Sequence, residues 1–171
     1  MMDNNPEMIA DTENVARILH QNWVIDGILQ HYAFVLRRNE TYISVNRPAV
    51  SSYDDDIASF VESHPDFYAN ENKTEYMRAL LNVGEIRQTE VRVNETRLNI
   101  EVEVEPRDVF TKSHAGVFTR HDGRNIKAGE AFSIESLKED ISSDDILLEV
   151  RSRLLDLAHL EYCKINCKRS F

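Results

Sequence analysis

The chain has 171 residues, of which 42% are hydrophobic and 29% charged, so it is long enough to bury a core and is not wholly disordered. Its formal net charge of -10 argues against general binding to nucleic-acid backbones or anionic membranes, because both need basic patches. No run of about eighteen apolar residues indicates a membrane span, and the acidic N-terminus lacks the features of a secretory signal. The two cysteines, Cys163 and Cys167, form no disulfide framework, which favours a cytoplasmic protein.

The first third of the chain predicts short helices around one hairpin. Residues 1–11 are expected to form a flexible leader, and residues 12–171 a single α+β domain. Thr12 is a suitable cap for a helix that presents apolar side chains up to Trp23 on one face. The branched and aromatic stretch 28–36 and the alternating stretch 41–46 predict two paired strands.

The middle of the chain changes from helical to strand periodicity. Serines before an acidic first turn at residues 51–56 predict a helix start. Residues 74–81 are interpreted as a helix, although a strand remains an alternative. Residues 85–93 and 97–106 alternate in polarity, so they predict two half-buried antiparallel strands.

The last third predicts more strands and then a long helix. Residues 113–119 and 131–134 are candidate strands, and Asp122-Gly123 is a hairpin-type turn. Residues 142–162 predict a helix with a broad apolar stripe over about five turns. The expected fold is therefore α+β: an antiparallel sheet of about five or six strands packed against a long C-terminal helix, with short N-terminal helices.

Basic and histidine side chains concentrate in two segments, residues 31–48 and 113–130. Arginine forks suit phosphate groups, so an anion-binding pocket is one hypothesis, although exposed ion pairs and turn decoration explain the same residues more simply. His114 and His121 are an odd number of positions apart, which sends them to opposite faces of a straight strand. The candidate ligand-binding residues are His31, Arg37, Arg47, His114, Arg120 and His121.

Other clusters are better explained by structure than by chemistry. Asp54, Asp55 and Asp56 point in different directions on a helix, so a helix start explains them better than a metal site. His159, Cys163 and Cys167 have no clear fourth ligand, which favours cysteine as a small buried side chain. No phosphate loop, nucleophile elbow or zinc motif occurs, so no catalytic residue, metal or cofactor is predicted.

Four short stretches carry a resemblance. Ala33-Phe34, residues 40–47, Val104-Glu105-Pro106 and residues 114–117 resemble a group of small uncharacterised bacterial proteins, in which a hairpin precedes a His-Ala strand. The proline run expected before that His-Ala pair is absent here. The resemblance implies a bacterial cytoplasmic protein and no particular chemistry.

The leading functional hypothesis is a soluble protein-binding accessory component, because the surface is acidic and no catalytic set emerges. One alternative is a small enzyme or sensor acting on a nucleotide-like anionic ligand. Another is a structural homodimer formed through the predicted C-terminal helix.

Overall fold

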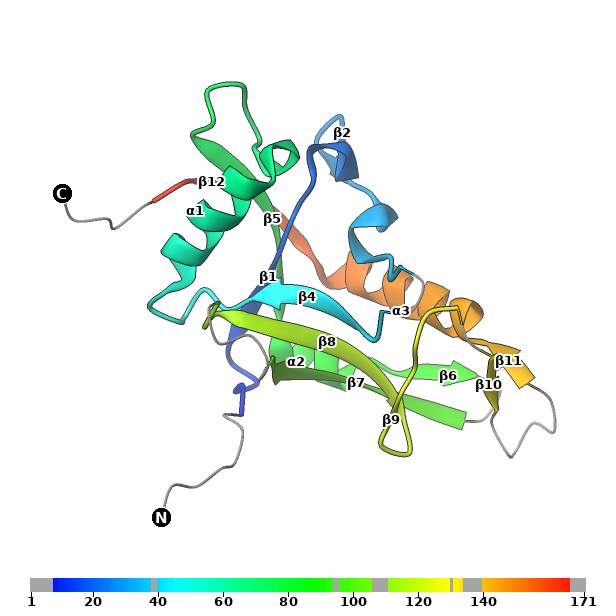
Figure 1. The fold of residues 1–171 in the computed structure, drawn as a ribbon. Coiled ribbons are helices and arrows are strands. Elements are labelled where there is room, and N and C mark those ends of the chain that lie inside the picture. Colours follow the sequence, from blue (N-terminus) through cyan, green and yellow to red (C-terminus); the bar gives the residue numbers. More distant parts are fainter. Residues whose placement is uncertain are drawn as a thin grey trace, which may run out of the picture.

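A computed structural model of the protein describes residues 8–37, 40–93, 96–105, 111–129, 131–133 and 140–166. Its centre is an antiparallel sheet of eight strands that bends strongly, so that one part stands across the other (Figure 1). From one edge to the other, its strands are β12 (His159–Lys164), β5 (Glu75–Asn82), β1 (Asn14–Ile18), β4 (Tyr42–Asn46), β8 (His114–His121), β7 (Thr96–Val104) and β6 (Val91–Val93), with β9 (Arg124–Asn125) beside β8.

The remaining elements are short helices and two small hairpins. The α-helices are α1 (Tyr53–Ser63), α2 (Val83–Gln88) and α3 (Ser143–Leu157), and the 3-10 helices are η1 (Gln21–Trp23), η2 (His31–Phe34) and η3 (Pro65–Phe67). The hairpins pair β2 (Val24–Ile25) with β3 (Ile28–Leu29), and β10 (Ala131–Ser133) with β11 (Asp140–Ser142).

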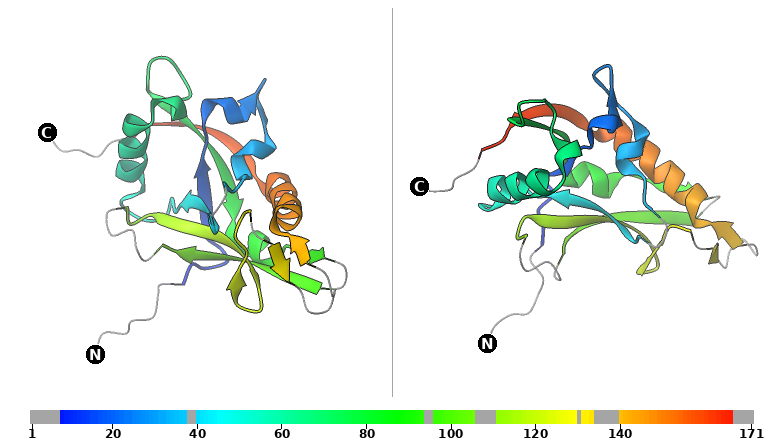
Figure 2. Two further views of the ribbon diagram at one scale, coloured as in Figure 1. Left: turned by 45° about the vertical axis from the view of Figure 1, so that its right-hand side comes forward. Right: turned by 45° about the horizontal axis from the view of Figure 1, so that its top comes forward.

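The sheet is covered on both faces (Figure 2). On one face, α1 buries Tyr53, Ile57 and Val61 against Ala16 and Ile18 of β1. On the other face, α2, α3 and η2 enclose the larger core. That core takes the inward side chains of β4, β7 and β8 and, from α3, Ile146, Val150 and Leu154.

The fold expected from the sequence is wrong in its C-terminal part. The sheet has eight strands rather than five or six, and α3 ends at Leu157 instead of continuing to residue 162. Residues 159–164 form the edge strand β12, paired with β5. Leu160 and Tyr162 fit the spacing of a helix as well as that of a strand. The strand forms because β5 offers hydrogen-bond partners to this segment. The apolar stripe proposed for a helix-driven homodimer therefore spans two different elements.

The N-terminal helix at residues 12–23 is also wrong, because this segment forms β1 and η1. Strand β1 lies inside the sheet, so Val15 packs on one face while Ala16 and Ile18 pack on the other. A strand buried on both faces loses its alternation and imitates the spacing of a helix. The helix interpretation of residues 74–81 is wrong for the same reason. Residues 75–82 form strand β5, in agreement with the strand alternative.

Several local predictions are confirmed. The acidic stretch starts α1, with Asp54, Asp55 and Asp56 in its first turn. Of the strands predicted at residues 41–46, 97–106 and 113–119, residues 42–46 lie in β4, residues 97–104 in β7 and residues 114–119 in β8. Asp122 and Gly123 both have positive φ, 48° and 76°, as a hairpin turn of type I′ requires. The strand expected at residues 28–36 is wrong, since this stretch forms β3 and η2.

The alternating stretch 85–93 is only partly a strand. Residues 83–88 form α2, whose first turn is capped by the Asn82 side chain accepting a hydrogen bond from the Glu85 N–H, and β6 begins at Val91. Ile134, the last residue of the candidate strand 131–134, lies outside the described residues.

Candidate functional site

Arg47, a predicted ligand-binding residue, is part of the structural core. Its side chain is only 6% exposed and forms a two-pronged ion pair with Glu13, with Nε–Oε1 at 2.6 Å and the second contact at 3.0 Å. Its main-chain N–H donates to the Ser113 carbonyl. Through Arg47, these contacts connect Glu13, which directly precedes β1, with Ser113, which directly precedes β8. The guanidinium is therefore engaged by a partner within the fold.

His114 and Arg120 share the outer face of β8, but each is engaged by a neighbouring strand. His114 Nε2 and the hydroxyl of Ser44 on β4 are hydrogen-bonded. Six residues further on, which corresponds to about 20 Å along a strand, Arg120 forms a bidentate ion pair with Glu103 of β7 at 2.5 and 2.8 Å. Because of this hydrogen bond, the pKa of Glu103 lies below its usual range.

The other three predicted residues lie elsewhere. His121 ends β8, and its Nδ1 lies 3.7 Å from the Asp122 carboxylate. His31 belongs to η2, where its ring lies tilted beside that of Tyr32 and its buried Nδ1 has no hydrogen-bond partner among the described residues. Arg37 is exposed, and its main-chain N–H donates to Glu40. The six residues thus occupy both faces of the sheet and both ends of β8, and their shared ligand stays a prediction.

The acidic start of α1 has a structural task. The Asp56 carboxylate accepts hydrogen bonds from the Ser52 hydroxyl and from both the main-chain N–H and the hydroxyl of Ser113, at 2.9, 3.1 and 2.6 Å. It therefore fastens α1 to the start of β8. Within the described residues, no group of three metal-ligating side chains converges. Cys167 lies outside them, and burial raises the pKa of the Cys163 thiol.

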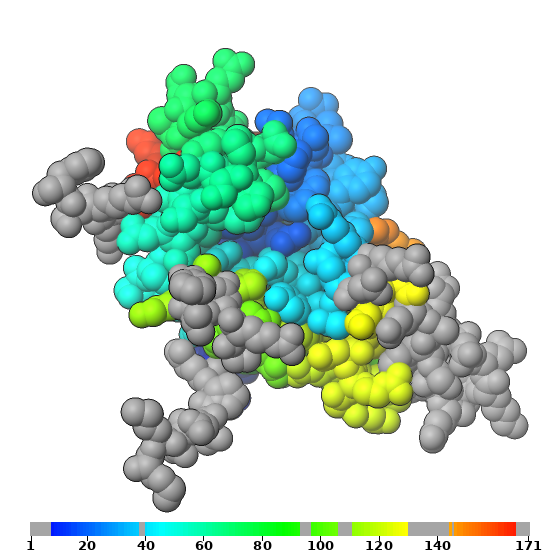
Figure 3. Space-filling view, in the orientation of Figure 1, coloured from blue at the N-terminus to red at the C-terminus, as the bar shows by residue number. Residues whose placement is uncertain are grey.

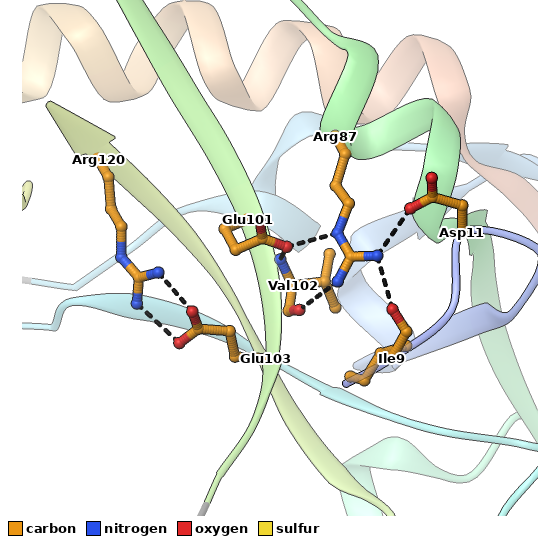
Figure 4. A network of polar contacts seen from close by, with 7 residues as sticks. All are labelled: Ile9, Asp11, Arg87, Glu101, Val102, Glu103 and Arg120. Atoms are coloured by element: carbon orange, nitrogen blue, oxygen red, sulfur yellow. Dashed lines mark hydrogen bonds and ion pairs between the residues drawn. The ribbon is translucent and has the colours of Figure 1, made fainter. Parts of the chain in front are cut away.

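A second polar network fixes the N-terminal segment (Figure 4). Arg87 of α2 donates to Glu101, to Asp11, and to the main-chain carbonyls of Ile9 and Val102. Ile9 is fully buried in the core, although the sequence places it in the expected leader. Glu101 is therefore paired within the fold.

An open hollow at the surface lies between η2 and α3. It is an open groove of about 670 Å³, and seven of its nine described lining residues are of apolar type, with one acid and one base; the surface exposed inside it is nevertheless more polar than apolar. The lining residues are Phe34, Val35, Leu36, Ala128, Gly129, Asp144, Leu147, Leu148 and Arg151. None of the six residues predicted from the sequence lines it.

Each wall of this η2–α3 groove is held in place by the fold. On the η2 side, Arg17 of β1 donates from Nε to the Ala33 carbonyl at 3.0 Å and from a terminal nitrogen to the Ser44 carbonyl at 2.9 Å. Its guanidinium lies 5.0 Å from the centre of the Trp23 ring. Burial lowers the pKa of Arg17 to about 10, so the side chain remains charged at neutral pH.

The opposite wall is anchored by main-chain contacts. Ala128 N–H donates to the Glu40 carbonyl at 3.1 Å, and Gly129 N–H donates to Asp144 at 3.2 Å. Helix α3 is fixed by its core residues, which leaves Leu148 on the outer side of the helix. Both walls are thus held by contacts within the fold.

Two exposed apolar side chains line the η2–α3 groove, and three more lie on the chain segment that precedes it. Val35 is 39% and Leu148 51% exposed, and both line the η2–α3 groove. Tyr32 on η2, together with Ile25 and Ile28 on the β2–β3 hairpin, is also largely exposed. In the space-filling view, the blue surface of this segment borders the orange surface of α3 (Figure 3). Clusters of this kind mark interaction sites more often than isolated exposed residues do.

A second groove, between β6 and α3, has a different character. Its volume is about 480 Å³, and its lining is mostly charged: Thr89, Glu90, Arg92, Glu149, Arg153, Asp156 and Leu157. The charges pair locally, as Arg153 does with Glu149 at 3.2 Å. Exposed pairs of this kind contribute little and remain solvated. The apolar surface inside this groove is no smaller than that of the η2–α3 groove, but most of its lining side chains are charged.

Comparison of the chain with family models, with curated proteins and with solved structures finds no match in any of the three. Among the described helices, none has both the length and the apolar character needed to cross a membrane.

Proposed function

We propose that the protein is a protein-binding accessory component and that its docking surface is the η2–α3 groove. The observation that carries the proposal is the coincidence of this groove with the exposed apolar side chains of Tyr32, Val35 and Leu148. Apolar surface that surrounds a hollow is the arrangement into which a partner inserts an anchoring side chain.

The composition of the groove suggests the chemistry of the partner segment. The exposed side chains of Val35 and Leu148 favour aliphatic or aromatic groups of a partner. Arg151 favours a carboxylate beside them, whereas the acid in the lining, Asp144, already accepts a hydrogen bond from the Gly129 N–H. The acidic surface of the whole chain discourages highly acidic partners at a distance. A mainly apolar segment that carries one acidic group fits both conditions.

The energetic contribution is sufficient for specific binding. Complete burial of a valine or leucine side chain stabilises by about 1.5–3 kcal/mol, so burying the exposed parts of Val35 and Leu148 contributes about 2 kcal/mol together. Two glutamates at these positions remove that contribution and leave charges in the interface. We expect a loss of affinity of at least about tenfold, because 1.4 kcal/mol corresponds to a factor of ten.

Site-specific photo-crosslinking in the cell of origin tests this proposal. A photoreactive phenylalanine analogue replaces Leu148, and the same analogue at Met8, which is 84% exposed, serves as the control. The proposal expects one discrete crosslinked protein from position 148, and its loss when Val35→Glu is added. If position 148 yields only the products seen from position 8, the groove is not a docking surface.

A further inference from the structure

Strand β12 forms an edge of the sheet, where its second side has no neighbour among the described strands. It pairs with β5 through residues 159–164, and the order of the sheet begins with it. Figure 2 shows β12 in red along this border. An edge of this kind presents main-chain donors and acceptors to a further strand.

The register shows which main-chain groups of β12 point outward. Ile165 N–H donates to the Thr74 carbonyl at 2.9 Å, so this pair of opposite residues is a hydrogen-bonded one. In an antiparallel ladder, hydrogen-bonded and non-bonded pairs alternate, so the odd-numbered residues of β12 face β5. Leu19 N–H donating to the Met77 carbonyl on the other side of β5 is consistent with this alternation. The N–H and C=O groups of Leu160, Tyr162 and Lys164 therefore point away from the sheet.

We infer that β12 pairs antiparallel with β12 of a second copy of this chain, centred on Tyr162, and so continues the sheet across a two-fold axis. Two identical strands can lie side by side and antiparallel only around an axis perpendicular to the sheet, which keeps every residue on its own face. With Tyr162 opposite its counterpart, Leu160 lies opposite Lys164 of the second copy. All three outward pairs then exchange hydrogen bonds, about six in total.

The side chains of β12 are compatible with this pairing. Tyr162 is 58% exposed, and pairing brings the two tyrosine rings together over the axis, where aromatic pairs stabilise a sheet. The aliphatic stem of Lys164 covers Leu160 while its ammonium group remains in water. The charge of Glu161 is already neutralised by Arg78, whose Nε lies 2.9 Å from the carboxylate. No like charges therefore oppose each other in this register.

The expected dimer is weak. One pair of six-residue strands buries less area than the interfaces of about 1,200–2,000 Å² typical of stable complexes. We expect a dissociation constant of roughly 1–100 µM. The η2–α3 groove and strand β12 share no residue.

Disulfide trapping tests the register directly. Cysteine at position 162 places the two Cα atoms about 5.5 Å apart across the axis, within the range of a disulfide. The matched control is Lys164→Cys on the same strand, because its two Cα atoms lie about 14 Å apart in this register. Both variants are made in a Cys163→Ser, Cys167→Ser background and oxidised mildly at about 100 µM protein, within the expected range of dissociation constants.

The inference expects covalent dimer from Tyr162→Cys at a rate at least about tenfold above that of Lys164→Cys. Sedimentation velocity is expected to show reversible dimer for the unmodified chain and monomer for Tyr162→Glu, which brings two carboxylates together on the axis. Equal trapping rates, or a purely monomeric unmodified chain at several hundred micromolar, would overturn the inference.

Discussion

The strongest stability effect is expected from breaking the ion pair between Arg47 and Glu13. Both side chains are largely buried, with 6% and 13% exposed, and two nitrogen–oxygen contacts join them. Arg47→Met leaves the Glu13 carboxylate without its counter-charge, and such a loss costs about 3–5 kcal/mol. For a chain of this length, that corresponds to a decrease in Tm of about 6–20 °C.

Urea denaturation of the wild type, Arg47→Met, Glu13→Leu and the double variant measures this effect as a double-mutant cycle. We expect each single variant to lose several kcal/mol and the double variant to lose less than their sum, because it leaves no unpaired charge. A loss below about 1 kcal/mol for Arg47→Met would refute the reasoning. That result would return Arg47 to the list of residues available for a ligand.

Three further predictions follow from individual contacts. Gly116→Ala places a Cβ 2.7 Å from Cδ2 of Tyr42, so urea denaturation is expected to show a loss of about 1–3 kcal/mol, and an unchanged midpoint would contradict this close approach. Arg120→Gln is expected to raise the pKa of Glu103, which Arg120 holds below its usual range, as followed by carbon NMR during a pH titration. The stabilisation from this pair is present above the pKa of Glu103 in the unfolded chain and is lost as the pH falls through the folded-state pKa, so equal pKa values in both proteins would exclude the contact. Because burial raises the pKa of Cys163, iodoacetamide at pH 8 is expected to label it more slowly in the folded than in the unfolded chain, as mass spectrometry of the labelled peptide shows. Equal rates would mean that the thiol is not buried.

Strands buried on one face could be predicted from the sequence, and strands buried on both could not. In β7, Leu98, Ile100 and Val102 face the core while Asn99 and Glu101 face away from it, so the alternation is plain. In β1 and β5, core residues occupy both faces, and the apolar spacing imitates a helix. The end of α3 at Leu157 depends on the partner strand β5, which lies some eighty residues earlier in the chain.

The candidate site was harder to predict than the fold. The concentration of basic residues and histidines suggested Arg47 and His114 as ligand-binding residues. In the structure, both side chains form hydrogen bonds with other residues of the fold. Val35 and Leu148 line the same groove although they are more than a hundred residues apart, and no local spacing in the sequence indicates this. Only the degree of exposure of these apolar side chains, which a sequence does not contain, reveals the surface.

The affinity of the groove for its partner tests the central claim most directly. Isothermal titration calorimetry compares the wild type, a Val35→Glu, Leu148→Glu double variant and the exposed-residue control Met8→Glu, each with the protein captured at position 148. The account predicts binding at least about tenfold weaker for the double variant and unchanged for the control, with equal stability of all three proteins. Equal affinity of the double variant and the wild type would contradict the account.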